Sequence, residues 1–271
     1  PQKVKAVLKS YSRHVSSSAS MTTITKDVSE YFNPLSRVTA IDYISALEKI
    51  YVVEELKAWS PRLRSKTAIA ISPTRHFVDP AIAAHFLGAG ASDLMNDLET
   101  YGLLFESLVV RYLRIYAESL GGSVYHYRDH SGLEADAIVH LPGGKWGAFE
   151  VKLGEAWIEE AAGNLLKLKD KIDTDKTKAP SFLGVICGSG YAYQRKDGVD
   201  VIPIDCRRNG VKKQGYMALF AILGHTSSMK AGLGSRLFCS LFASQALSRK
   251  NPSMSIWSIS CMRQPDFNSV L

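Results

Sequence analysis

The sequence predicts a mixed α/β protein of the α+β kind, in which helices flank a sheet. Two observations predict this class. Segments with apolar residues at three- and four-residue steps, as in helices, alternate along the chain with short runs of β-branched and aromatic residues, as in strands. The second group of strand-like runs is bounded by helical segments, which indicates a mixed sheet covered on both faces. We expect three regions: residues 1–80, 81–215 and 216–271.

Residues 1–80 begin with three predicted helices. A Ser- and Thr-rich loop separates the first, KVKAVLKSYSRHV, from the second, TITKDVSEYF. The third helix follows Ser36, a suitable N-cap. Its expected apolar stripe consists of Val38, Ile41, Ile44, Leu47 and Ile50. The runs YVVEEL and RSKTAIAIS then predict the two strands of a β-hairpin.

Three helices followed by a β-hairpin form the element order of a winged-helix domain. In a DNA-binding domain of this kind the third helix enters the major groove, so Arg37 and Lys49 are candidate DNA-binding residues. A winged helix can also serve as a contact surface for a protein or as a spacer between domains. The sequence leaves both interpretations open.

Residues 81–215 contain the predicted sheet. A long helix is expected from about Ser92 to Ser119, ended by Gly121 and Gly122. The strands that follow are VYHYR, LEADAIVHL, WGAFEVKL, SFLGVICGS and VDVIPID, with the helix WIEEAAGNLLKLKDKI after the third strand. The turn PGGK joins the second and third strands into a hairpin. Residues 216–271 are rich in Ser and poor in acidic side chains, and the sequence predicts no fold for them.

Several charged residues interrupt the two strands of this hairpin. Buried strands seldom tolerate charges unless the charges are paired or bind something. Side chains alternate between the two faces of a strand, so we expect each strand to have one polar face. These polar faces contain Glu134, Asp136, Ile138 and His140 in one strand, and Ala148, Glu150 and Lys152 in the next.

If these faces coincide, Asp136, Glu150 and Lys152 converge, with Glu134 at the near edge. Carboxylate oxygens suit Mg²⁺ or Mn²⁺, which polarises a phosphate and lowers the pKa of a bound water. Lys152 would orient or deprotonate that water, or neutralise charge on the phosphorane. Glu106 leans toward the packed face of the long helix, where a metal or Lys152 would offset the cost of burying it. The alternative is a Glu150–Lys152 ion pair on a solvated face.

Net charge, cysteine spacing, apolar runs and the first residues indicate the kind of partner and the compartment to expect. The net charge of +7 favours a polyanion such as DNA as partner, although a basic surface without a target is the alternative. The four cysteines lie far apart without CxxC spacing, which favours core positions in a reducing cytoplasm. No apolar run reaches the roughly 18–20 residues that span a bilayer. Because the chain begins at Pro1 with neither an initiator Met nor a signal-like segment, we expect it to be a C-terminal piece of a longer protein.

The charged constellation resembles the PD-(D/E)XK, or restriction-endonuclease-like, nuclease superfamily. That superfamily uses an Asp on the second strand and (D/E)xK on the third, with a Glu on the first helix in many branches. The resemblance implies that Asp136 and Glu150 bind the metal, that Lys152 is the lysine of the motif and that Glu106 is the helix acid. Ala135 stands where the superfamily's proline precedes the Asp.

More narrowly, the chain is similar to the C-terminal half of bacterial and archaeal predicted ATPases. In these, an AAA-type ATPase domain precedes a winged helix and a domain of unknown function with a restriction-endonuclease-like fold. The segments that carry the similarity are RHFVDPAIAAHFLG, FESLVVRYLRIYA, RDHSGLEADAIVHLPGGKWGAFEVKLGE and AAGNLLKLKDKI. The similarity implies an ATPase domain upstream of Pro1, and either Mg²⁺-dependent DNA cleavage or a non-catalytic regulatory role. Because no GxxxxGK[ST] motif occurs, we expect no ATP binding by this chain.

Overall fold

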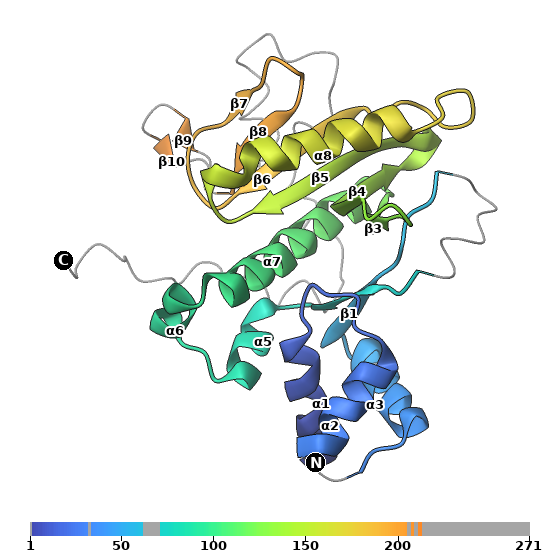
Figure 1. Ribbon diagram of the computed structural model, residues 1–271, viewed down its shortest axis with the longest axis vertical. Helices are drawn as coiled ribbons and strands as arrows, with labels where there is room; N and C mark the ends of the chain where they lie inside the picture. Colours follow the sequence, from blue (N-terminus) through green and yellow to red (C-terminus); the bar gives the residue numbers. More distant parts are fainter. Residues whose placement is uncertain (1, 32–33, 62–70, 205–206, 209–210, 213–271) are drawn as a thin grey trace, which may run out of the picture. The chain divides into compact units, whose positions relative to one another are not determined.

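The computed structural model describes residues 2–31, 34–61, 71–204, 207–208 and 211–212 (Figure 1). Within these residues, three helices and a pair of strands precede a six-stranded mixed sheet that has helices on both faces. This arrangement confirms the predicted mixed α/β class. Most of the predicted strand RSKTAIAIS, and the C-terminal region from residue 213 onward, lie outside the described residues.

The N-terminal helices lie where the apolar periodicity predicts them: α1 (Gln2–Arg13), α2 (Met21–Tyr31) and α3 (Arg37–Lys49). Ser36 caps α3, since its hydroxyl accepts a hydrogen bond from Thr39 N at 3.1 Å. Their shared core includes Val7, Tyr11, Ile24 and Ile44, which are all nearly inaccessible to solvent.

The strand pair that follows differs from the predicted hairpin. Strand β1 (Val53–Leu56) pairs antiparallel with β2 (Thr74–Phe77), from Val53 opposite Phe77 to Leu56 opposite Thr74. The partner of β1 therefore begins just after Pro73, in a segment without a predicted strand. A proline lacks the N–H that a ladder requires, which explains why pairing starts beyond it.

The apolar stripe predicted along α3 is wrong at three of its five positions. The residues that face the core are Ala40, Ile44 and Leu47, which recur at steps of four and three. Solvent instead reaches Val38 (68% exposed), Ile41 (40%) and Ile50 (67%). The helix therefore presents apolar side chains to solvent beside Arg37 and Lys49, which are also exposed.

Helices α5 (Pro80–Leu87), α6 (Ala91–Asn96) and α7 (Leu98–Ser119) connect the strand pair to the sheet. The single helix predicted from Ser92 is interrupted at Asp97, whose φ of −125° and ψ of 77° are not helical. The Asp97 carboxylate accepts hydrogen bonds from Thr100 N at 3.0 Å and from Thr100 Oγ1 at 2.7 Å. Asp97 therefore caps a new helix, because its side chain accepts a hydrogen bond from an N–H group of the first turn that has no partner within the helix.

The sheet has the strand order β3-β4-β5-β6-β8-β7. Its strands are β3 (Ser123–Arg128), β4 (Glu134–Leu141), β5 (Lys145–Lys152), β6 (Phe182–Cys187), β7 (Tyr193–Gln194) and β8 (Asp200–Pro203). Pairing is antiparallel from β3 to β5, parallel from β5 through β6 to β8, and antiparallel at β7. Helix α8 (Ile158–Lys171) forms the crossover that a parallel pair requires. The five predicted strands are confirmed, and two-residue β7 is too short to have a detectable periodicity.

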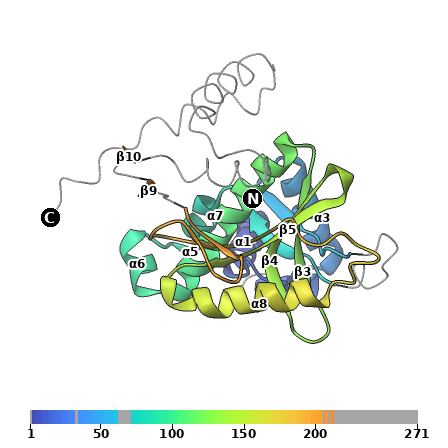
Figure 2. The same cartoon turned by 90° about the horizontal axis from the view of Figure 1, so that it is seen from above.

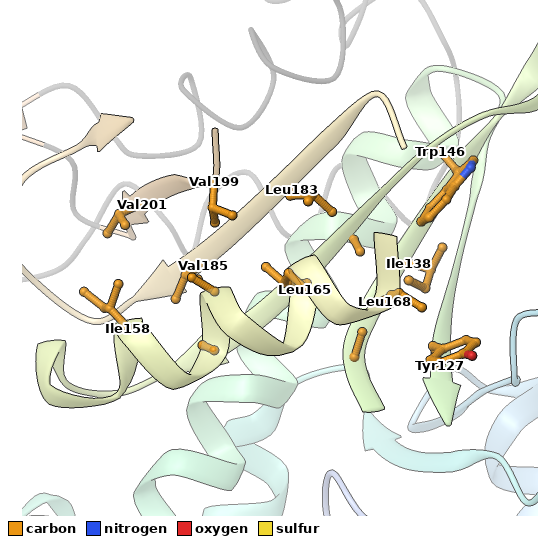
Figure 3. Close-up of a cluster of buried hydrophobic side chains, with 14 of the residues drawn as sticks. Tyr127, Ile138, Trp146, Ile158, Leu165, Leu168, Leu183, Val185, Val199 and Val201 are labelled. Atoms are coloured by element: carbon orange, nitrogen blue, oxygen red, sulfur yellow. The ribbon is translucent and has the colours of Figure 1, made fainter. Parts of the chain in front are cut away.

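Helices α7 and α8 cover opposite faces of the sheet (Figures 1 and 2). On one face, α8 contributes Ile158, Leu165 and Leu168 to a cluster with sheet residues (Figure 3). On the other face, α7 packs against Val139 and Phe149. The sequence prediction of one polar face on the hairpin is therefore wrong: Ile138 and Ala148 are fully buried on the α8 side. With both faces covered, charged side chains remain only near the strand ends.

One side of α7 is polar and packs against the N-terminal strand pair. Arg114 forms an ion pair with Glu54 and donates a hydrogen bond to Glu55 O at 2.9 Å. Ser107 is fully buried, and its hydroxyl lies 3.4 Å from Nδ1 of His76. Among the described residues, none of the helices combines the length and apolar character that a membrane-spanning segment requires.

Candidate metal and phosphate site

Two carboxylates gather where β4 and β5 separate. The two strands pair as far as Ala137 opposite Phe149. In the same register, the next residues opposite one another are Asp136 and Glu150. Their carboxyl groups interact electrostatically just beyond the last ladder pair. The predicted convergence of these two side chains therefore occurs at the end of the hairpin ladder.

A β-bulge in β4 sets the direction of Asp136. On β3, Tyr125 lies opposite Ile138 and Tyr127 lies opposite Ala135, so β4 contains one additional residue in this interval. As a result, Ala135 and Ile138 pack in the same cluster although simple alternation would separate them. The bulge interrupts the regular ladder at the position where Asp136 turns toward β5.

The carboxylate of Asp136 takes the place of a backbone acceptor. Its Oδ2 accepts a hydrogen bond from Val151 N at 2.7 Å. The antiparallel ladder with β4 has ended two residues earlier, at Phe149, so the side chain satisfies an N–H group that the neighbouring strand leaves without a backbone acceptor. This contact fixes one oxygen of Asp136 directly beside β5.

Lys152 joins the two carboxylates. Its Nζ lies 2.9 Å from Oε2 of Glu150 and 3.9 Å from Oδ2 of Asp136. Glu150 and Lys152 are two residues apart on β5, the spacing at which strand side chains project together. The Glu150 side chain is 4% exposed, that of Asp136 20% and that of Lys152 30%, so solvent reaches the cluster at Asp136 and Lys152.

Glu106 approaches the same cluster from α7. It is partly exposed, and its charge interacts with those of Asp136, Lys152 and Glu150. A helix and two strands therefore contribute to one group of three acidic residues and one basic residue. The sequence analysis expects Glu106 on the packed face of the long helix, and the structure places it there partly exposed, beside the hairpin residues.

Glu134 lies at the edge of this cluster, where its charge acts on Asp136 and Glu150, and Arg37 and Lys49 lie on α3, outside the cluster. Glu134 is exposed at the start of β4 and pairs with Nε of Arg128 at 3.1 Å. Arg37 and Lys49 are the first and last residues of α3, which packs on α1, α2 and β1. Sequence reasoning missed Ser16, in the loop between α1 and α2, whose hydroxyl donates a hydrogen bond at 2.8 Å to Leu103 O of α7, one turn before Glu106. No local pattern marks a contact between residues so distant in the chain.

Burial and mutual repulsion shift the pKa values of the cluster. Burial, assisted by the charge of Asp136, raises the pKa of Glu150 to about 8. The same two causes raise the pKa of Glu106, and burial raises that of Asp136. Burial disfavours the Lys152 ammonium, but Asp136 and Glu150 together raise its pKa. Three carboxyl groups around one ammonium form a site whose ionised state an additional cation would stabilise.

Raising the pH from 6.5 to 8 is expected to destabilise the protein in the absence of divalent metal. In this window Glu150 holds its proton in the folded chain, because its pKa is about 8, but has lost it in the unfolded chain, where the usual value is 4.5. The folded state binds more protons, so the free energy of unfolding falls as the pH rises. Glu150→Gln should flatten this slope in thermal unfolding measured across the window.

Buried histidines contribute equally to the wild-type protein and to Glu150→Gln in this measurement. Burial lowers the pKa of His76 to about 3 and that of His126 to about 4, from the usual 6.5. Near pH 6.5 only the unfolded chain binds these protons, so the histidines add stability as the pH rises through about 6.5, and they do so equally in both proteins. Equal slopes for the wild-type protein and Glu150→Gln between pH 6.5 and 8 would contradict the raised pKa.

The donor set suits a hard divalent cation. Mg²⁺ is commonly held by one or two carboxylates and takes its other ligands from water and phosphate. Asp136 and Glu150 supply two such carboxylates beside one another. Among the residues that the structure describes, no group of three or more His, Cys, Asp or Glu side chains forms a ready-made metal site. A metal held by Asp136 and Glu150 would therefore have to take its other ligands from water or from a substrate.

Comparisons with known proteins divide the chain into two matched segments. Residues 1–93 match the domain of unknown function DUF8612, and residues 101–207 match the domain of unknown function DUF4143. None of the curated proteins matches the chain. One solved structure does: a half-complex from a tetradecameric assembly of Thermococcus gammatolerans McrB AAA+ hexamers with bound McrC. The identity is 9% over 73% of this chain and 70% of that chain, and the TM-score of 0.31 is too low to carry an argument. DUF4143 is typical of AAA-ATPase-associated proteins, so residues 101–207 are similar to a domain found in that setting.

Proposed function

We propose that this chain is the C-terminal part of an AAA-type ATPase and that it is a Mg²⁺- or Mn²⁺-dependent DNA phosphodiesterase. In this proposal residues 1–80 form a winged helix, and residues 81–215 form a nuclease domain of the PD-(D/E)XK type. The observation that carries the proposal is the convergence of Asp136, Glu150 and Lys152 where β4 and β5 separate. The association of DUF4143 with AAA-ATPase proteins supports the assignment to an ATPase.

Each residue of the cluster has a distinct role in this proposal. Asp136 and Glu150 hold the metal, which, when bound, polarises the phosphate and lowers the pKa of a bound water. Lys152 has a raised pKa and therefore carries a positive charge at neutral pH. That charge favours orientation of the water and neutralisation of the developing phosphorane over abstraction of a proton. Glu106 supports the outer ligand shell through its interactions with the two metal-binding carboxylates.

The proposed DNA contact lies on α3. Arg37 and Lys49 are exposed at its two ends, and the chain has a net charge of +7. Positive side chains bind the phosphate backbone without regard to sequence and release counterions as they do so. Charge reversal at both positions should therefore weaken DNA binding, and the remaining binding should depend less on salt.

The test is a cleavage assay on duplex, branched and single-stranded DNA with Mg²⁺ or Mn²⁺. We expect cleavage that stops when EDTA removes the metal and resumes when metal is added in excess. Protein that binds the metal but cleaves none of the three substrates would overturn the assignment as a nuclease.

A second candidate is a non-catalytic regulatory module that binds a protein. The observation that favours it is the apolar surface of α3, where Val38 and Ile41 are 68% and 40% exposed. Apolar side chains are more useful in a protein contact than beside a phosphate backbone. The absence of a calorimetric signal for Mg²⁺ would support this candidate over the first.

A further inference from the structure

We propose that the protein binds a basic segment of a partner protein at an exposed aromatic patch formed by Trp157, Tyr191 and Tyr193. The group that the patch would recognise is a cationic side chain, Arg or Lys, which stacks on an aromatic face beside carboxylates that have no ion pair of their own. The patch contains none of the residues of the carboxylate cluster. The inference therefore goes beyond the proposed nuclease and does not depend on it.

The three aromatic side chains of the patch are open to solvent. Trp157 is 58% exposed, Tyr191 78% and Tyr193 49%. Tryptophan is highly buried on average in folded proteins, as Trp59 and Trp146 are here. Single exposed apolar residues are ordinary, whereas a group of them on one surface marks a binding site. Contacts between the two segments that carry these residues show that they form one group.

These two segments begin side by side at the ends of neighbouring strands. Strands β5 and β6 are parallel and adjacent in the sheet. The 3-10 turn Glu155–Trp157 follows β5, and the loop 188–192 follows β6. Gly188 N–H donates a hydrogen bond to Leu153 O at 3.3 Å, which joins the two segments where they leave the sheet.

Two further contacts enclose the patch. Gly190 approaches Glu155 so closely that a Cβ at this position would overlap the Glu155 carboxylate. Arg195 pairs with both carboxylate oxygens of Glu159, with 2.9 Å between Nη2 and Oε2. In the chain, Trp157 lies between Glu155 and Glu159. The two tyrosines lie between Gly190 and Arg195, so all three rings project from adjacent stretches of backbone.

The core beneath the patch holds both segments at one end of the sheet. Ile158, the residue after Trp157, belongs to the same buried cluster as Val201 (Figure 3). Val201 is also the residue that pairs with Tyr193 in the ladder between β7 and β8. The aromatic patch therefore lies on a packed part of the fold, which reduces the ordering that a partner would have to impose.

Two exposed carboxylates beside the patch provide charge complementarity to a cation. Glu155 and Glu160 are exposed, and neither forms an ion pair with another residue that the structure describes. Glu160 is three residues after Trp157 at the start of α8, so the carboxylate and the indole lie on the same side of the helix. A cation placed over the indole would therefore have a carboxylate within reach.

Single-stranded nucleic acid is the alternative occupant, because its bases stack on exposed aromatic rings. Such sites also have a groove of positive side chains that follows the phosphates. Segments 153–160 and 188–198 instead contain four acidic side chains and two basic ones, in a chain whose net charge is +7. One of the two basic residues, Arg195, is paired with Glu159 and Asp197. These charges would repel phosphate, so they favour a basic protein segment.

The test is fluorescence anisotropy on the full chain with a fluorescein-labelled peptide that alternates Arg and Gly. The matched probe contains citrulline, the uncharged analogue of Arg, in place of Arg. We expect the chain to bind the Arg peptide and not the citrulline peptide. Trp157→Ala should raise the dissociation constant of the Arg peptide about 10-fold, as for loss of a partly desolvated cation–π contact. The fold should persist, because the exposed Trp157 side chain makes no capping hydrogen bond.

Three further variants separate the ring from the charge. Trp157→Phe keeps an aromatic face and should retain most of the binding. Glu160→Gln should weaken binding about 3-fold, as for loss of one exposed ion pair. Asp170→Asn removes the same charge about 15 Å further along α8 and should leave the dissociation constant unchanged.

Several outcomes would overturn the proposal. They are a wild-type chain that does not bind the Arg peptide, equal binding of the Arg and citrulline peptides, and equal dissociation constants for the wild-type chain and Trp157→Ala. Single-stranded oligo(dT) that displaces the Arg peptide and loses affinity in Trp157→Ala would identify nucleic acid as the occupant and would also overturn it. None of these outcomes depends on whether the chain cleaves DNA.

Discussion

Asp136→Asn should abolish metal-dependent DNA cleavage, with a fall in rate of about 1,000-fold or more, as for the loss of one preorganised electrostatic group. The substitution removes a charged metal ligand but keeps the shape of the side chain. Asn can still accept the hydrogen bond that Val151 N donates to Asp136 Oδ2 at 2.7 Å, so we expect the fold to persist. The measurement is the initial rate of cleavage at a fixed Mg²⁺ concentration, with circular dichroism to verify folding.

Asp170→Asn provides a matched control for this experiment. Asp170 is exposed near the end of α8, so its substitution changes net charge by the same amount away from the cluster. We expect it to cleave like the wild-type protein. Lys152→Ala should lose cleavage as Asp136→Asn does while still binding DNA through α3. If Asp136→Asn and Asp170→Asn cleave at the same rate, the cluster is not the catalytic site.

Phe149→Ala should lower the free energy of unfolding by about 3–5 kcal/mol, the usual cost of emptying a buried aromatic position. Phe149 is fully buried and packs against Phe182, with 5.4 Å between the ring centroids. It also belongs to the cluster that joins β5 to α7. Because Glu150 follows it directly on β5, loss of this packing should also loosen the site. Urea denaturation monitored by circular dichroism measures the change.

Phe149→Leu is the control for size and hydrophobicity. It keeps an apolar side chain at the position and should cost less than Phe149→Ala, about 1.5 kcal/mol. A loss below about 1 kcal/mol for Phe149→Ala would show that the contact between β5 and α7 contributes little to stability. In that case the position of Glu150 would depend on the pairing of β5 with β6 instead.

Local periodicity was sufficient to predict most elements of the fold. The first helix is recognisable because Val7, Leu8 and Tyr11 recur at helical steps, and all three are buried. Ser36 is recognisable as an N-cap because it precedes such a pattern and its hydroxyl has a backbone N–H to accept from. Both signals depend only on residues within a few positions of one another.

The site was partly predictable for the same reason. A tight turn makes β4 and β5 neighbours, and the two-residue spacing of Glu150 and Lys152 makes their side chains project together. The bulge near Asp136 could not be predicted, because it depends on how β3 and β4 share their register. The face assignment failed for Ile138, since helix α8 covers a side of the sheet that alternation alone would leave polar.

Contacts between distant segments account for the remaining differences. The pairing of β1 with Thr74–Phe77 joins segments separated by a long stretch of chain. The hydrogen bonds of Ser16 to α7 and to Arg75 have no counterpart in local sequence. Asp97 ends one helix and starts another although the apolar pattern continues through it, because a side-chain cap outweighs a modest helical propensity.

The amide of Val151 has an unusual partner for a strand residue, a carboxylate in place of a carbonyl. In nuclear magnetic resonance spectra its proton would therefore respond to the ionisation of Asp136 far more than the neighbouring amides of β5. The chemical shift of this single cross-peak, followed during titration with acid or with a diamagnetic cation, would therefore report the binding of protons or metal ions to the acidic cluster. This measurement requires neither DNA nor catalytic turnover.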